Sequence, residues 1–509
     1  MALSESVTAA IAVLRRRPAD ILPFYLLGAA IPAIVRVLPF LGIAVAFVYL
    51  ELSGRLDAVL TELETGVPDP PDPETDPEAF DAWAEEVAPL AQQLLPLELQ
   101  LFAAAVILAS IVLAITLYAA VSAAQLSACY GRLRDDRGLV IGLAGAGRFW
   151  LRFVGLYVLE IVAWLTVGTI ALVGAVLLGA ALAPATGAGV AAVVVVLPTL
   201  LVAGLAIAAI RAVFAFAPVA VVVDDAGVFG SLSATLGFLR RHPIAAGFYY
   251  VLAVGASVAL SVLTGLLVVA EVASLGTLLT TLIVFPFLDL LKTALYGGPK
   301  DKLSPPSAPE RPFRSRFADG LRRGWAEMFS FVRATPFLHA FVVVAAVGTF
   351  WAGWELAEPL AGTVETSIDE RLEGHVPPTA ALEFFGNNWM VAYTTAFGGL
   401  ALAIPALFSL AFNGVVLGAV ARLEVEIVEL AAFVVPHGIL EVPAIFVASA
   451  LGLWLGAVGW RAFRGRASRQ DVVEALERAF WVVVGLGIVL AVAAFIEGFV
   501  SPYYYQPFI

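Results

Sequence analysis

The sequence contains very little cysteine and few charged residues. Its single cysteine, Cys129, excludes an internal disulfide and any metal site built from several cysteines. Charged residues make up 14% of the 509 positions and hydrophobic residues 61%, whereas soluble domains average roughly 25% and 45–50%. The mean hydropathy of +0.94 indicates more apolar residues than one soluble core can bury, so we expect many of them to face lipid.

Lysine is scarce as well, and no sequence motif for catalysis stands out. Only three of the 29 basic residues are lysines (Lys292, Lys300 and Lys302), and the net charge of −12 excludes a nucleic-acid-binding protein, which needs a basic face. Acidic, lysine-poor loops of this kind give the chain a halophile-like composition. No G-x-S-x-G, Walker A, G-x-G-x-x-G or H-E-x-x-H motif occurs in a fitting context, so we expect no enzyme, no cofactor and no metal site.

Apolar runs of about twenty residues recur along the chain and predict an all-α polytopic membrane protein. We expect about eleven transmembrane helices in two bundles. The first six are expected near residues 21–50, 100–124, 153–182, 190–212, 244–270 and 276–296. Five more are expected near residues 337–358, 389–411, 412–430, 438–460 and 478–499. The span at 412–430 is the weakest, and a short helix with a loop is the alternative there, because it carries Arg422, Glu424, Glu426 and Glu429.

The basic residues favour one orientation of these spans. If the N-terminus is cytoplasmic, 25 of the 29 lysines and arginines fall in segments predicted to face the inside, as the positive-inside rule requires. The first apolar run is too long for the core of a signal peptide, so we expect it to be retained as a span. The sequence therefore predicts a multi-pass protein of the cell (plasma) membrane with its C-terminus outside.

Composition also predicts two membrane domains joined by a linker. Residues 1–296 form the expected six-span domain, with an acidic outer loop at 51–99, and residues 313–509 form the expected five-span domain. Residues 297–312 are rich in proline and charge and are expected to form a cytoplasmic linker. At the start of the second domain, residues 313–333 have the pattern of a basic amphipathic helix on the inner leaflet.

Within the acidic outer loop and the first domain, four further features carry expectations. Residues 67–76 are rich in proline and are expected to lack fixed structure, whereas residues 77–100 have the pattern of an amphipathic surface helix. Glu160 lies inside a predicted span, and Arg36 is a candidate partner for it. The pair Asp224-Asp225 indicates a turn, with a metal ligand as the less favoured interpretation.

Three polar groups interrupt the apolar runs of the second domain. They are Asn387-Asn388, Asn413-Gly414 and the stretch Pro436-His437-Gly438-Ile439-Leu440-Glu441-Val442-Pro443. Unsatisfied polar groups in lipid cost roughly several kcal/mol each, so we expect these groups to meet each other or to line a wet cavity. His437 and Glu441 are one helical turn apart and can share a face. Gly438 allows close approach of a backbone, and the prolines predict a broken helix.

A broken helix beside polar groups has two interpretations. It is typical of the substrate sites of secondary transporters, and it is also typical of a structural polar clamp between helices, in which His437 and Glu441 satisfy each other.

Residues 384–388 (FFGNN), the pair Asn413-Gly414 and residues 436–453 (PHGILEVPAIFVASALGL) resemble the stage II sporulation protein M family. The resemblance covers roughly residues 320–509 and implies a membrane domain of about five spans. In spore-forming bacteria, members of that family act as a membrane scaffold for a complex of wall-degrading enzymes. The first domain, through residues 214–243, is loosely similar to integral-membrane domains found beside glycerophosphodiester phosphodiesterases, and no catalytic residues come with that similarity.

The resemblance and the missing catalytic motifs favour a non-enzymatic scaffold or assembly factor that positions protein partners of unknown identity at the lipid bilayer. The alternative is a transporter or permease with a polar site around His437 and Glu441, which the titration of histidine near neutral pH supports. An intramembrane zinc protease is disfavoured because the motif is H-x-x-x-E rather than H-E-x-x-H. The sequence leaves a homo-oligomer open.

Overall fold

The computed structural model describes the chain except for residues 1, 67–76, 363–365, 369–371, 373 and 505–509. The described residues are almost entirely helical, with one isolated bridge between Thr366 and Glu424 and no strand among them. This confirms the all-α fold class. The proline-rich segment expected to lack fixed structure lies outside the described residues.

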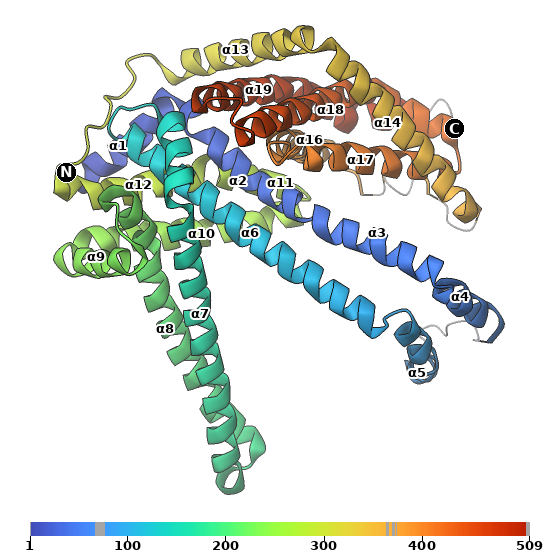
Figure 1. The fold of residues 1–509 in the computed structure, drawn as a ribbon, viewed down its shortest axis with the longest axis horizontal. Coiled ribbons are helices and arrows are strands. Elements are labelled where there is room, and N and C mark those ends of the chain that lie inside the picture. Colours follow the sequence, from blue (N-terminus) through green and yellow to red (C-terminus); the bar gives the residue numbers. More distant parts are fainter. Residues whose placement is uncertain (1, 67–76, 363–365, 369–371, 373, 505–509) are drawn as a thin grey trace. The chain divides into compact units, whose positions relative to one another are not determined.

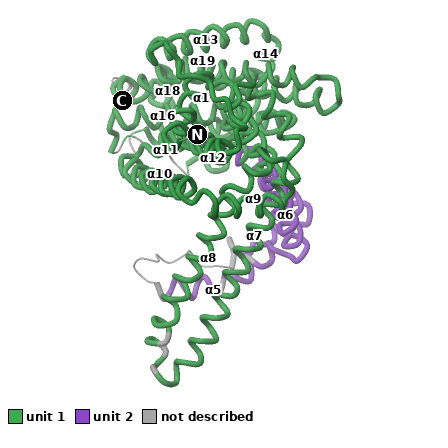
Figure 2. The backbone as a smooth tube through the Cα atoms, turned by 90° about the vertical axis from the view of Figure 1, so that its left-hand side faces the viewer, with its two compact units in different colours: residues 1–31, 116–509 green, residues 32–115 purple. Residues whose placement is uncertain are grey.

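By its internal contacts the chain forms two compact units (Figure 2). One consists of residues 32–115, and the other of residues 1–31 and 116–509. The smaller unit contains α3 (Val37–Leu52), α4 (Arg55–Gly66) and α5 (Pro77–Gln93), with the adjoining parts of α2 (Leu22–Val35) and α6 (Leu97–Arg132). The amphipathic helix expected at 77–100 is present as α5, whereas the expected division of the chain at 297–312 stays a prediction.

The N-terminal part of the larger unit is built on a pair of long helices, α7 (Gly138–Thr186) and α8 (Ala188–Asp224), which pack along each other (Figure 1). The neighbouring helices are α1 (Leu3–Arg16), α9 (Val228–Arg241), α10 (Pro243–Val269), α11 (Ala273–Leu279) and α12 (Phe285–Gly297). Aromatic side chains around Phe216 form the core between α8, α9 and α10. Much of the remaining apolar surface of α7 and α8 is exposed, as expected for helices that face lipid.

The C-terminal part of the larger unit is a helical bundle centred on α19 (Arg469–Phe499). Helices α13 (Phe313–Ala334), α16 (Pro377–Gly398) and α18 (Ile427–Phe463) pack against α19, and α14 (Pro336–Ala357) packs against α17 (Ile404–Leu423). A one-turn helix, α20 (Ser501–Tyr504), follows α19. Figure 1 shows these helices side by side in the yellow-to-red part of the ribbon.

Ten helical segments of the described residues are long and apolar enough to cross a membrane. The predicted span without a counterpart among the ten is the one at 389–411, which corresponds to α16; this helix carries Glu383, Asn387 and Asn388. The spans expected at 389–411 and 412–430 were displaced toward the C-terminus. The chain turns between α16 and α17, where Leu402 and Ala403 have positive φ angles, and α17 ends before Glu424. A single apolar run therefore contains the end of one helix and the start of the next.

The basic helix expected at 313–333 is present as α13. Gly324, Met328 and Phe331 are buried, and Gly324 packs closely on Gly485 of α19. Phe317, Trp325 and Phe329 are exposed apolar residues, and Leu321 and Val332 are half-buried. An exposed aromatic face of this kind is compatible with the inner-leaflet position that the sequence predicts.

Ion pairs in the first domain identify the partner of Glu160 and explain the turn at Asp224-Asp225. Glu160 pairs with Arg211 of α8 at 3.0 Å, so the expected pairing with Arg36 is wrong. Asp225 has a φ angle of 56° and ends α8, and its pKa is lowered mainly by a hydrogen bond from Arg152. Asp224 accepts hydrogen bonds from Tyr296 and from Lys302, at 2.6 and 2.9 Å. The aspartate pair is thus held as a structural turn.

Candidate functional site

Helix α18 carries His437 and Glu441 one turn apart. The helix is continuous from Ile427 to Phe463 and includes both Pro436 and Pro443, so the broken helix expected from these prolines is wrong. A Cβ atom placed at Gly438 would meet only Val434 and Val442 of its own helix within 4 Å among the described residues, so the expected close backbone approach does not occur there. Because other helices pack against α18, it can tolerate the loss of the backbone hydrogen bond that each proline removes.

His437 points at residues from the C-terminal end of the chain, and among the described residues no hydrogen bond or ion pair joins it to Glu441, so the expected mutual pairing of His437 and Glu441 is wrong. His437 is 6% exposed, and its Nδ1 atom lies 3.0 Å from the hydroxyl oxygen of Ser501 in α20. Its Nε2 atom lies 3.9 Å from Oε1 of Glu497 in α19. The α18–α19 packing therefore brings together a histidine and two glutamates in one cluster, which we call the His–Glu–Glu cluster (His437, Glu441 and Glu497).

The carboxylates of the His–Glu–Glu cluster are incompletely satisfied. Asn388 of α16 lies beside the Glu441 carboxylate and also accepts a hydrogen bond of 3.3 Å from Asn387. However, Oε2 of Glu441 and Oε2 of Glu497 are buried and have no hydrogen-bond partner in the described part of the chain. Buried oxygens without partners are rare in proteins and call for a specific explanation.

Asn413 and Gly414 belong to a different polar group. The Asn413 amide donates to the Ser409 carbonyl of its own helix at 2.7 Å, and the Ser409 hydroxyl lies 2.8 Å from the Thr395 hydroxyl of α16. Gly414 faces Thr349 of α14, whose side-chain oxygen occupies the space that a Cβ atom at position 414 would need. These residues lie where α14, α16 and α17 meet. The sequence correctly identified them as polar residues within apolar runs, but they do not form one site with His437 and Glu441.

Sequence reasoning missed Glu497 and Ser501. Glu497 lies at the end of the last apolar run, and an intramembrane carboxylate in that position is itself a signal for a functional or paired group. Ser501 gives no signal of its own, because a serine after the last span is ordinary. Their relation to His437 depends on how α18 and α19 pack, which sequence spacing does not reveal.

The donor atoms of the His–Glu–Glu cluster are close enough to hold a metal ion. One atom from each of His437, Glu441 and Glu497 lies within 4.8 Å of the others. The imidazole nitrogen and the carboxylate oxygens are ordinary ligands of divalent metals. The same groups can also share protons, since two carboxylates so close together in a low dielectric cannot both be charged without a counter-ion.

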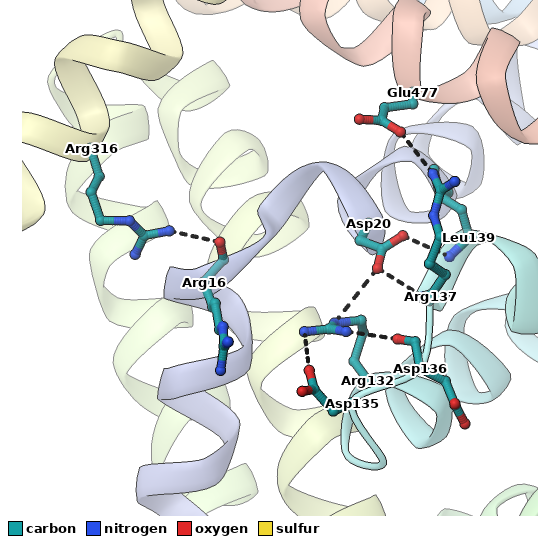
Figure 3. A network of polar contacts seen from close by, with 10 residues as sticks. Arg16, Asp20, Arg132, Asp135, Asp136, Arg137, Leu139, Arg316 and Glu477 are labelled. Atoms are coloured by element: carbon teal, nitrogen blue, oxygen red, sulfur yellow. Dashed lines mark hydrogen bonds and ion pairs between the residues drawn. The ribbon is translucent and has the colours of Figure 1, made fainter. Parts of the chain in front are cut away.

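A second polar region lies among α1, α13 and α19, where a cavity of about 1090 Å³ is lined by three carboxylates and by seven arginines, namely Arg15, Arg16, Arg17, Arg137, Arg311, Arg316 and Arg323. Figure 3 shows part of its wall: Arg137 pairs with Glu477 at 2.9 Å, and Arg316 donates to the Arg16 carbonyl at 2.7 Å. Apolar side chains such as Phe317 and Trp481 complete the lining. A positive cavity with apolar walls suits an anionic group attached to an apolar body.

Beside this cavity, Asp20 and Arg132 form a buried ion pair (Figure 3). Their side chains are 7% and 1% exposed, and Nε of Arg132 lies 3.6 Å from Oδ2 of Asp20. The Asp20 carboxylate also accepts from the backbone N–H groups of Gly138 and Leu139, at 2.8 and 3.1 Å, and so caps the start of α7. This network fastens the segment after α1 to α6 and α7.

The apolar helices, their exposed apolar faces and the few buried polar clusters define a polytopic α-helical integral membrane protein. Residues 338–502, from α14 to α20, match the family model described as stage II sporulation protein M, so this part of the chain is similar to that family. The match confirms the resemblance carried by the FFGNN, Asn413-Gly414 and PHGILE sequences. It covers less than half of the chain. No curated protein and no solved structure was found to match.

Proposed function

We propose that the protein is a non-enzymatic membrane scaffold whose C-terminal bundle positions partner proteins at the membrane. The family match supports this role, because the family resemblance implies a scaffold in spore-forming bacteria.

The observation that carries the proposal is the direct backbone packing of the bundle. A Cβ atom at Gly353 of α14 would overlap the Val415 carbonyl of α17, and one at Gly418 of α17 would overlap the Phe350 carbonyl of α14. Small residues that let backbones touch are the usual means of joining membrane helices tightly. A bundle packed in this way suits a rigid platform better than a carrier that must rock between two states.

The alternative, a transporter, has one observation in its favour. The His–Glu–Glu cluster lies within the apolar helices α18 and α19, and intramembrane ionisable groups often mark ion or proton pathways. The two proposals differ in what they require of the bundle, because a transporter must alternate between inward-open and outward-open states.

Distances between spin labels on α14 and α18 distinguish the two proposals. With the buried Cys129 replaced by alanine, labels at exposed Phe337 and Phe463 report on one end of the bundle. Labels at exposed Leu356 and Val428 report on the other end. We expect one narrow distance distribution for each pair of labels. It should be the same at pH 5 and pH 8, which bracket roughly the range over which histidine titrates, and the same in sodium and potassium salts. Two populations that change in opposite directions at the two ends would contradict the scaffold and support transport.

A further inference from the structure

The His–Glu–Glu cluster contains more carboxylate oxygens than its neighbours can satisfy with hydrogen bonds or positive charge. Glu441 and Glu497 place carboxylates next to each other, and one oxygen of each is buried without a hydrogen-bond partner among the described residues. No lysine or arginine pairs with either carboxylate in the same part of the chain, and His437, whose Nε2 atom lies 3.9 Å from Glu497, is charged only when protonated. In such a setting a positive ion or a proton must balance the carboxylates.

The orientation of His437 makes a metal ion the better explanation. Its Nδ1 atom is engaged by the Ser501 hydroxyl at 3.0 Å, while its Nε2 atom faces Glu497 at 3.9 Å, too far for a hydrogen bond. When Nδ1 carries the proton and donates to Ser501, the Nε2 lone pair points toward the carboxylates. Metal-binding histidines are held in this way, with the second ring nitrogen bonded to a neighbouring oxygen.

We propose that His437, Glu441 and Glu497 bind one divalent first-row transition-metal ion, with Ser501 orienting the imidazole. One nitrogen and two carboxylate donors suit zinc, and also manganese or iron. The donor atoms, now within 4.8 Å of one another, would need to close to roughly 3.4 Å around a zinc ion, because zinc bonds to nitrogen and oxygen are about 2.0–2.2 Å long.

The metal would have a structural consequence. Its ligands lie on α18 and α19, and the orienting hydroxyl lies on α20, so one ion would clamp the C-terminal end of α19 to the N-terminal half of α18. This goes beyond the scaffold role, and either proposal can fail alone, because metal binding is measured on the isolated protein and partner binding in native membranes. It also differs from the expectation, drawn from the sequence, that the chain has no metal site.

Zinc binding to the full-length protein tests the proposal. The purified protein in detergent is stripped with a chelator, reloaded with zinc and assayed for bound zinc and for affinity by competition with a chromogenic chelator. We expect one zinc ion per chain. Glu497→Gln preserves the shape of the side chain but removes a charged ligand, so its affinity should fall by about 100-fold or more, whereas Ser501→Ala should lose about 10–100-fold.

His339→Gln is the matched control, because His339 is a histidine of α14 that is bonded to Thr335 and lies outside the cluster. It should bind zinc as the wild type does. If the cluster variants do not fold, X-ray absorption of the zinc-loaded wild type still decides, since one imidazole and several oxygen donors are expected around the metal. Absence of bound zinc in the wild type, a different set of donors, or equal affinity in Glu497→Gln would overturn the proposal and leave a shared proton to balance the carboxylates.

Discussion

Replacing Asp20 with alanine is expected to destabilise the protein by about 3 kcal/mol or more, because the Arg132 guanidinium remains buried without its partner. Arg132 is 1% exposed, and its other side-chain partner, Asp135, is a largely exposed residue 3.3 Å away. The same substitution removes the acceptor for the N–H groups of Gly138 and Leu139 at the start of α7. The loss of a helix cap adds about 1 kcal/mol.

The expected result is a clear fall in the midpoint of thermal unfolding in detergent. Asp20→Asn should lose less than Asp20→Ala, since an amide oxygen can still accept from one N–H group. Asp319→Ala is the control, because Asp319 forms ion pairs with Arg311 and Arg322 on the surface, where such pairs contribute about 0–1 kcal/mol. An Asp20→Ala protein as stable as the Asp319→Ala protein would contradict a structural role for the buried pair.

Gly353→Val is expected to cost about 3 kcal/mol and to lower the amount of assembled protein in the membrane, at the upper end of the usual overpacking range. The atom in the way is the backbone carbonyl of Val415 in α17, which cannot rotate aside as a side chain could. The two helices must therefore separate along their whole contact. Gly418→Val should act in the same way through the Phe350 carbonyl.

Gly348→Val provides a close control for this prediction. Gly348 is on the same helix, α14, but no described atom outside its own helix backbone lies within 4 Å of a Cβ atom placed there. Both substitutions add the same side chain to the same helix, so a difference between them reports on contact with α17 alone. Quantitative immunoblotting of membranes and thermal unfolding in detergent are the measurements. Equal behaviour of Gly353→Val and Gly348→Val would contradict the tight α14–α17 contact.

Hydropathy and local patterns were sufficient to predict the fold class. Long apolar runs predicted the membrane helices because a span must be about twenty residues long and mostly apolar. The arginines and exposed aromatics of α13 predicted a basic amphipathic helix, and the structure contains it at Phe313–Ala334. The structure also confirms that Asp224-Asp225 forms a turn, with Asp225 at the left-handed end of α8.

Boundaries were harder to predict where one apolar run contains two helices. The run at 389–411 includes the turn between α16 and α17, and its only local signals are Gly398-Gly399 and Pro405. Hydropathy is insensitive to such a turn because every residue in it is apolar or glycine. The prolines of α18 were misleading in the opposite direction, since a helix buried among others can continue through Pro436 and Pro443.

The partners of polar residues could be predicted only when they are neighbours in sequence. His437 and Glu441 share a face because they are four residues apart, but Glu497 and Ser501 reach them through the packing of α18 and α19. Likewise, Glu160 pairs with Arg211, but the sequence contains several basic residues that could have been its partner. Chemical type narrows the choice of partner, and tertiary structure decides it.

Affinity purification of the tagged full-length protein from native membranes tests the scaffold role most directly. It is compared with Glu441→Gln and with Glu355→Gln, a control at an exposed carboxylate of α14. Specific partner proteins are expected to co-purify with the wild type and the control, and Glu441→Gln is expected to retain fewer of them while accumulating normally. Recovery of the protein alone from all three membranes, as a stable homo-oligomer without partners, would contradict the scaffold role and favour transport.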